Sequence, residues 1–386
     1  MQPAFIEILL QTYTLGLLAA SLYSLYMLKV FPSLPTTAAA ETWPKVSIIV
    51  PVKDEEDTIE LCLDTLLNLE YPSKEIIVIE GGSNDGTGRI LQTYSDKVTV
   101  LNERALPDGW IGKNWACHLG YLRSEGELLL FTDGDTAHVP SSLKRSVRHL
   151  LTNDVDMVSI YPKLVTRSFG ERLMTPLIAF LIFIYSGGNR VNDDASSRHM
   201  ANGQYILTTK SAYEKVGGHA AIKNEIVEDV KMAEAYKSRG CRVRVVYGFD
   251  ALETRMYSDF GELWRGWVKN TYAGFNFSPV KFVGGGLAIF AAFLLPFFIV
   301  AYGAFSGGGL FNLFTVYGSL CSVVVMGGMA ILHHRIGGSG KYTLLTPLAV
   351  TVYFAIMLVS FYKVTAGGGV GWKERKYDLK AMRKED

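Results

Sequence analysis

The sequence has few cysteines and no excess of either charge. Its four cysteines, at positions 62, 117, 241 and 321, lie far apart and form no CxxC pair, so neither a zinc site nor a disulfide framework is predicted. The 38 Lys and Arg residues nearly balance the 37 Asp and Glu residues, which leaves a net charge of +1. Because nucleic-acid binding usually requires a concentrated basic face, we expect no nucleic-acid partner.

Charged side chains are absent from three long stretches, Ile8–Leu28, Phe282–Leu332 and Tyr342–Tyr362. A helix needs about 20 apolar residues to cross a bilayer. The first and last stretches therefore predict one span each and the middle stretch predicts two. We expect an N-terminal transmembrane anchor over residues 1–30 and a C-terminal region over 278–386 with about three transmembrane helices and a basic tail. A transporter would require functional charges inside such spans, and these stretches contain none.

The flanking charges predict the orientation of the anchor. The first apolar run lacks the basic start of a signal peptide and a clear cleavage site, which favours an uncleaved anchor. Lys29 follows the run and only Glu7 precedes it, so the positive-inside rule places the following domain in the cytoplasm of a multi-pass cell-membrane protein. The tail from Trp372 to Asp386 has six Lys or Arg residues. Three preceding spans would place this tail outside, whereas its charge favours the inside, so its side stays open.

Residues 31–43 are rich in Pro, Thr and Ala and are predicted to be a linker. Residues 44–259 form one predicted domain, in which apolar runs alternate with helical patterns such as Thr58–Leu69, with Asp57 as its N-cap. The continuous hydrophobicity of the runs is typical of parallel strands covered on both faces, and hence of an α/β fold. The predicted strands are Val46–Val52, Glu75–Ile79, Val98–Leu101, Leu128–Thr132 and Met157–Tyr161.

Two further stretches have intermediate character. Leu173–Tyr185 is apolar but too short to span comfortably, so it is expected to be re-entrant, interfacial or buried. Residues 260–277 combine Trp264 and Trp267 with Arg265, which predicts an amphipathic helix at the level of the lipid headgroups. Two roles are equally open for the two tryptophans: contact with a substrate at the membrane, and simple anchoring.

The ends of the predicted strands carry the chemistry, because ligands of open parallel sheets bind beyond the carboxyl ends of the strands. Asp133 and Asp135 follow the fourth strand, with only Gly134 between them. Such an oxygen-rich pair suits Mg²⁺ or Mn²⁺, which could neutralise phosphate oxygens. The alternative is an ordinary strand-ending turn, in which Asp and Gly are also common.

Six motifs, taken together and in this order, resemble the family 2 glycosyltransferases, which have a GT-A fold. They are VSIIVPVKDEEDTI (46–59), EIIVIEGGSNDGT (75–87), GWIGKNWA (109–116), GELLLFTDGDT (126–136), GGH (217–219) and VEDVKMAEAYKSRG (227–240). The flanking segments NGQYILTTKSAYEKVGGH (202–219), WRGWVKN (264–270) and GWKERKY (371–377) are similar to carotenoid- and hopanoid-associated members and, more distantly, to ceramide glucosyltransferases.

The resemblance implies a metal-dependent hexosyltransferase that uses a nucleotide-sugar, such as a UDP-sugar, and a membrane-lipid acceptor. At matching positions it implies that Asp133 and Asp135 bind the metal and the donor diphosphate, and that Lys113 approaches the donor base or phosphates. Asp229 would be the general base, oriented by Glu228. The residues implied for the nucleoside pocket are Pro51, Lys53, Glu55 and Glu80.

The chain also departs from the family pattern. Glu80 stands where the family usually has Asp, Gly81 replaces the following acid, and the QxxRW motif of processive members is absent. A polysaccharide synthase is therefore disfavoured. A transferase that uses a polyprenyl phosphate acceptor, and a catalytically inactive nucleotide-sugar-binding scaffold, stay open. Glu228 and Asp229 also fit the first turn of a helix, where the helix dipole favours acids.

Overall fold

The computed structural model describes residues 3–37, 42–103, 105–306, 311–336, 338–366, 370–372 and 375–377. The chain divides into two compact units. The helical unit comprises Met1–Val30, Thr166–Gly188 and Tyr257–Gly368, and the α/β unit comprises the remaining segments, chiefly Phe31–Val165 and Asn189–Met256. The predicted continuous domain over residues 44–259 is therefore wrong in one respect: the apolar segment Thr166–Gly188 packs with the other apolar helices.

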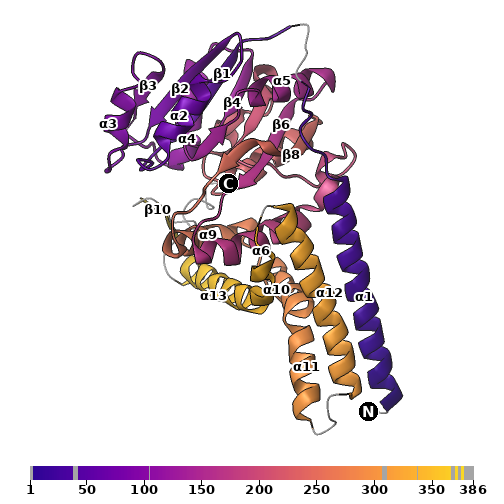
Figure 1. Ribbon diagram of the computed structural model, residues 1–386. Coiled ribbons are helices and arrows are strands. Elements are labelled where there is room, and N and C mark those ends of the chain that lie inside the picture. Colours follow the sequence, from indigo (N-terminus) through magenta and orange to yellow (C-terminus); the bar gives the residue numbers. More distant parts are fainter. Residues whose placement is uncertain are drawn as a thin grey trace. The chain divides into compact units, whose positions relative to one another are not determined.

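The α/β unit is built on a sheet whose strands have the order β3-β2-β1-β4-β7-β6-β8-β5 (Figure 1). Strands β1 to β4 run parallel to one another, as predicted, whereas β7 is antiparallel to both β4 and β6. The sheet is thus mixed rather than parallel throughout. Its strands are β1 Val46–Val52, β2 Lys74–Glu80, β3 Thr99–Asn102, β4 Leu128–Phe131, β5 Thr136–His138, β6 Met157–Leu164, β7 Ile206–Thr209 and β8 Val243–Thr254.

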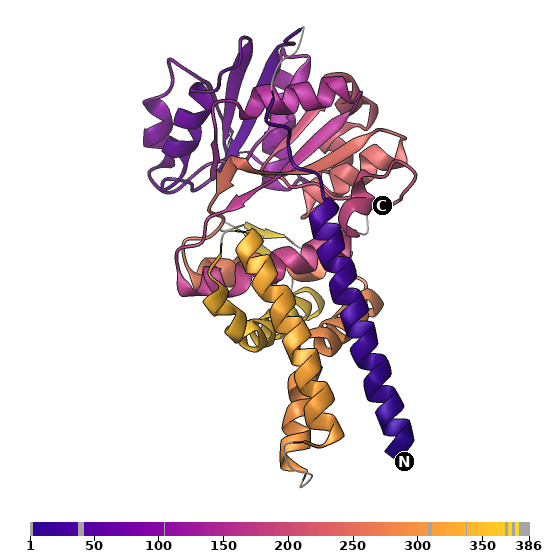
Figure 2. The same ribbon diagram turned by 45° about the vertical axis from the view of Figure 1, so that its right-hand side comes forward.

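Helices cover both faces of this sheet (Figure 2). They are α2 Ile59–Leu67, α3 Thr87–Gln92, α4 Gly112–Arg123, α5 Ser142–Thr152, α7 Lys210–Lys215 and α8 Glu228–Ser238. The first of these confirms a predicted helix with two corrections. Its N-cap is Thr58 rather than Asp57, and it ends at Leu67 rather than Leu69.

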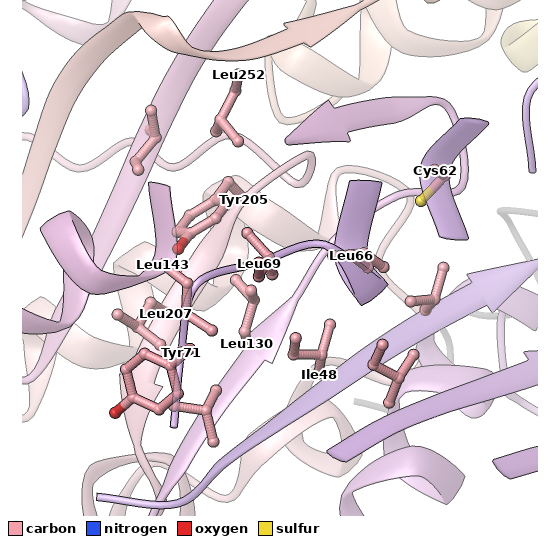
Figure 3. Packing of buried hydrophobic residues seen from close by; sticks show 14 of the residues in the cluster. Ile48, Cys62, Leu66, Leu69, Tyr71, Leu130, Leu143, Tyr205, Leu207 and Leu252 are labelled. Atoms are coloured by element: carbon pink, nitrogen blue, oxygen red, sulfur yellow. The ribbon is translucent and has the colours of Figure 1, made fainter. Parts of the chain in front are cut away.

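Side-chain alternation assigns one face of the sheet to α2 and α5. Ile48 of β1 and Leu130 of β4 are fully buried in one cluster with Leu66 of α2 and Leu143 of α5. Figure 3 shows these side chains together with Tyr205, which lies just before β7. Because successive strand residues point to opposite faces, the neighbouring positions in β1 and β4 face the other side.

Helix α4 packs on that other side through a glycine. A Cβ added at Gly120 would lie 2.4 Å from Cγ2 of Ile49 in β1 and 2.8 Å from Cδ1 of Ile79 in β2. The absence of a side chain therefore lets the helix approach the two central strands closely. This close packing fixes the position of α4 on the sheet, and the first turn of α4 carries Lys113.

Residues 31–43 were predicted to be a linker, but the first part of this segment belongs to the α/β unit. The Leu34 N–H donates to the carbonyl of Tyr247 at 2.7 Å, and the Tyr247 N–H donates to the carbonyl of Pro32 at 2.8 Å. This segment therefore pairs with β8 instead of forming a free linker. Residues 38–41 lie outside the described residues.

The helical unit consists of α1 Pro3–Val30, α6 Phe169–Ser186, α9 Phe260–Gly274, α10 Pro279–Phe293, α11 Leu295–Phe305, α12 Leu313–Arg335 and α13 Thr346–Thr365. Helices α1, α11 and α12 run side by side within it (Figures 1 and 2). In the described part of the chain, four helical segments are long and apolar enough to cross a membrane: Ala4–Val30, Phe169–Ser186, Leu313–Arg335 and Gly340–Thr365.

These segments agree only in part with the predicted spans. The first and last predicted spans are confirmed by length and composition. The middle stretch gives one long helix, α12, because the preceding residues are divided between α10 and α11 at Leu294. Leu173–Tyr185, which was expected to be too short for a comfortable span, lies within the longer helix α6. That helix has 18 residues, qualifies as a candidate span by length and composition, and is 50% buried.

The predicted amphipathic segment, residues 260–277, contains α9, and α9 meets α10 at a bend of 117°. Beyond α13, two short strands, Val370–Trp372 and Arg375–Tyr377, pair antiparallel. The rest of the predicted basic tail lies outside the described residues.

We expect Gly120→Ala to lower the free energy of unfolding by about 1–3 kcal/mol, because overpacking of a well-packed interior costs about that much. The measurement is the thermal unfolding midpoint of the purified protein in detergent. Gly88→Ala in α3 is the matched control, since a Cβ there meets nothing within 4 Å and Ala favours helix. Equal midpoints for the two variants would contradict the close packing of α4.

Candidate functional site

Five of the residues proposed from the sequence lie around one pocket of the α/β unit. They are Pro51 at the end of β1, Asp133 after β4, Lys113 at the start of α4, and Glu228 and Asp229 at the start of α8. The strand pairing explains this, because Val52 lies opposite Glu80 and Ile49 opposite Phe131, so that the three strands end at the same edge. The pocket is also lined by Cys117, Phe131, Thr132, Gly203, Ile206, His219 and Met232.

Lys113 links the two acidic segments. Its Nζ lies 2.7 Å from Oδ1 of Asp133 and 2.8 Å from Oε1 of Glu228. Burial alone would lower the pKa of Lys113, but the carboxylates of Asp133 and Glu228 raise that pKa well above its ordinary value. The ammonium group is therefore charged and forms two charge-assisted bonds.

Asp229 is held by two backbone N–H groups. Gly203 donates to its Oδ2 at 2.9 Å and Val230 donates to its Oδ1 at 2.8 Å. Burial and the neighbouring carboxylate of Glu228 nevertheless raise the pKa of Asp229 to about 7. A carboxylate with such a pKa can exchange a proton near neutral pH.

Gly203 approaches all three charged groups closely. A Cβ at this position would lie 3.0 Å from Nζ of Lys113, 3.2 Å from Oε1 of Glu228 and 3.5 Å from Oδ2 of Asp229. The turn that carries Gly203 is fixed from β6, because the Asn202 N–H donates to Oγ of Ser159 at 2.7 Å. A residue without a side chain therefore completes the wall of the pocket.

Asp135 lies close enough to Asp133 and to Glu55 to interact electrostatically with both. Burial and the carboxylates of Asp133 and Glu55 raise the pKa of Asp135 to about 7. Oγ1 of Thr136 donates to Oδ1 of Asp135 at 3.2 Å, and Oγ1 of Thr58 donates to Oε2 of Glu55 at 3.1 Å. The carboxylates of Asp133, Asp135 and Glu55 are hard oxygen ligands. A bound cation would stabilise their ionised form.

The two remaining predicted donor-binding residues tie the loops after β1 and β2 together. Nζ of Lys53 donates to the carbonyl of Gly82 at 2.6 Å. The buried carboxylate of Glu80 accepts a hydrogen bond from the Ser83 N–H. Neither Lys53 nor Glu80 lines the pocket that contains Lys113.

The seven other lining residues were not predicted as site residues, and two of them, Gly203 and His219, make polar or close contacts that matter to the site. Gly203 carries no functional group, and only its position beside Lys113 gives it a role. His219 was part of the GGH motif, but nothing in the sequence indicated that it would face this pocket. Its Nδ1 lies 2.8 Å from the Tyr213 hydroxyl, which also accepts the His219 N–H at 2.9 Å. Burial lowers the pKa of His219 to about 3, so the imidazole is neutral.

Residues 47–217 match the model of glycosyl transferase family 2. The chain contains a family 2 glycosyl transferase domain. The match covers Lys113, Asp133 and Gly203 of the pocket, as well as Asp135, which does not line it. It ends before Glu228 and Asp229, which the α/β unit brings to the pocket.

Known proteins resemble the chain well beyond this family 2 domain. The 4,4'-diaponeurosporenoate glycosyltransferase of Staphylococcus aureus is 25% identical over 346 residues, which cover 86% of this chain and 88% of the relative. Among solved structures, the mannosyltransferase PcManGT from Pyrobaculum calidifontis, in complex with GDP-Man and Mn²⁺, has a TM-score of 0.51 at 16% identity. That similarity covers 93% of this chain and 97% of PcManGT, and it establishes the fold.

The carboxylates of the family 2 domain fit a divalent cation that is shared with a substrate. In the described residues, no group of three or more His, Cys, Asp or Glu side chains is arranged to hold a metal ion. Mg²⁺ is typically bound by one or two carboxylates together with substrate phosphates and water. Asp133 and Asp135 match that pattern.

The three predicted acceptor or interface residues, Trp264, Arg265 and Trp267, lie outside the family 2 domain. All three are on α9 of the helical unit. Arg265 is exposed and the two tryptophans are half-buried. Helix α9 buries one face, and the residues of that face include Leu263 and Val268.

We expect Tyr213→Phe to lower the free energy of unfolding by about 1–3 kcal/mol, because it leaves the backbone N–H of His219 buried without an acceptor. Thermal unfolding in detergent measures the change. Tyr121→Phe is the control: its hydroxyl bonds the exposed Glu214 at 3.0 Å, so a change of less than about 0.5 kcal/mol is expected. If both variants unfolded at the same temperature, the Tyr213 hydroxyl would have no such role.

Proposed function

We propose that the chain is an inverting hexosyltransferase that moves a sugar from a nucleotide-sugar, for which we favour a UDP-sugar, to a hydroxyl group of a membrane lipid. One observation carries this proposal: Asp133 and Glu228 bond the same Lys113 ammonium in a pocket that Asp229 also lines. The pocket therefore combines groups suited to a diphosphate with a carboxylate suited to proton removal.

Asp133 and Asp135 would hold Mg²⁺ or Mn²⁺ at the donor diphosphate. When bound, such an ion would neutralise the negative charge that develops on the departing diphosphate. Lys113 would bind a phosphate oxygen by a charge-assisted hydrogen bond. Pro51, Lys53, Glu55 and Glu80, or the loops that they fix, would contact the nucleoside.

Asp229 would act as the general base. Its carboxylate takes the proton of the lipid hydroxyl while the hydroxyl oxygen bonds the anomeric carbon, and the bond from that carbon to the diphosphate oxygen breaks. A single displacement of this kind inverts the configuration. General-base assistance is typically worth about 10² to 10⁴-fold in rate. The N–H groups of Gly203 and Val230 orient the Asp229 carboxylate, and Glu228 acts through Lys113.

The apolar helices support a membrane acceptor. Four helical segments in the described chain have the length and composition of spans, and the S. aureus relative is named as a 4,4'-diaponeurosporenoate glycosyltransferase. The α/β unit would lie at the cytoplasmic face of the cell membrane. Trp264, Arg265 and Trp267 would contact lipid headgroups or the acceptor.

Mass spectrometry of total lipids tests the proposal in cells that lack the gene and are complemented with a variant. Wild-type protein should restore a lipid whose mass exceeds its precursor by one sugar residue. Asp229→Asn should not restore it, because the amide cannot take the proton, yet the purified variant should still bind UDP with near wild-type affinity.

Asp96→Asn is the matched control for this experiment, since Asp96 is exposed and distant in sequence from every site residue; it should restore the glycolipid fully. Transfer by Asp229→Asn at a near wild-type rate would refute the base assignment and favour an acceptor that is already anionic, such as a polyprenyl phosphate. A polymeric product would favour a polysaccharide synthase. No gene-dependent glycolipid, together with no donor hydrolysis, would favour a binding scaffold.

A further inference from the structure

The Lys113 ammonium lies where the two functional halves of the pocket meet. Asp133 belongs to the donor half and Glu228 to the helix that presents Asp229, and Lys113 bonds both within 2.8 Å. The side chains of Lys113 and Glu228 are only 21% and 12% exposed, and Gly203 closes the site beside them. In the absence of donor, the positive charge of Lys113 is therefore already balanced by protein carboxylates.

A divalent ion and this ammonium compete for the same carboxylate. Two like charges about 4 Å apart repel by several kcal/mol at the effective dielectric constant of a protein. A metal ion on Asp133 would therefore be repelled by Lys113 as long as Lys113 keeps its bond to Oδ1 of that residue. Either the ammonium or the ion can be close to Asp133, but each weakens the binding of the other.

We infer that Lys113 exchanges partners during donor binding: its ammonium leaves Asp133 for a phosphate oxygen of the nucleoside diphosphate, and Asp133 becomes available to the divalent cation. This inference rests on the proposed donor and metal roles. The exchange replaces one charge-assisted hydrogen bond with another, so little bonding is lost. Lys113 keeps its bond to Glu228 and so continues to position the start of α8.

One consequence is that the site binds metal poorly until the diphosphate arrives. Lys113 is thus a donor-binding residue that also makes metal binding depend on the donor. Removing its charge should strengthen metal binding to the donor-free protein and weaken diphosphate binding. A purely structural lysine would produce neither effect.

The test is the dissociation constant of Mn²⁺ for the purified full-length protein in detergent, without nucleotide, measured from the paramagnetic resonance signal of free Mn²⁺. The key variant is Lys113→Met combined with Glu228→Gln. It removes one positive and one negative charge, so the net charge of the site is unchanged, and Glu228 is not left as a buried carboxylate without its ammonium partner. We expect Mn²⁺ to bind roughly tenfold more tightly than to wild type. The affinity for UDP should fall.

Lys113→Arg is the control that keeps the positive charge, and it should bind Mn²⁺ as weakly as wild type. Adding Asp133→Asn to the double variant should abolish the gain. The exchange is refuted if the double variant binds Mn²⁺ no more tightly than wild type, or if Lys113→Arg gains as much. The metal role itself is tested separately, by measuring Mn²⁺ binding in the presence of UDP to the single variants Asp133→Asn and Asp135→Asn. If both bind Mn²⁺ as tightly as wild type, the proposed metal role is refuted.

Discussion

One ammonium group stabilises a pocket in which several carboxylates would otherwise repel one another. Lys113 bonds Asp133 and Glu228 directly, and burial together with neighbouring carboxylates raises the pKa of both Asp135 and Asp229 to about 7. Such crowding costs stability, and functional sites are where proteins commonly retain it. The same crowding gives the site its chemistry, because it attracts cations at one end and makes a carboxylate basic near neutral pH at the other.

The fold positions these groups by means of strand order. The parallel strands β1, β2 and β4 end at one edge of the sheet and deliver Pro51 and Asp133, while the close packing of Gly120 fixes the helix that carries Lys113. The antiparallel strand β7 reverses the direction of the chain, and the turn before it brings the Gly203 N–H to Asp229. Apolar helices make up the second unit, and among the described residues four of its helical segments have the length and composition of membrane spans.

The sequence predicted the parts of this structure that depend on strong local patterns. Continuous apolar runs identified β1, β2, β3, β4 and β6, and the acidic pair after β4 identified Asp133. Lys113, Glu228 and Asp229 were predicted only from the resemblance to the family. Strand β5 was missed because it has only three residues, and β7 because it has only two apolar residues, which are followed by Thr208 and Thr209. Strand β8 was missed because charged residues such as Arg244 and Glu253 interrupt its apolar pattern. The bond between Lys113 and Glu228 joins positions 115 residues apart, and a role for Gly203 requires knowing what surrounds it. Neither follows from local sequence.

The dependence of kcat/KM on pH tests most directly whether this crowded pocket performs base catalysis. Asp229 accepts a proton only when it is ionised, and its raised pKa means that it is protonated below about pH 7. With saturating metal, kcat/KM for the lipid acceptor should therefore rise about tenfold per pH unit below that point and level off above about pH 8. A profile that is flat between about pH 5.5 and 8.5 would contradict the assignment of Asp229 as a base whose pKa is set by burial and by Glu228.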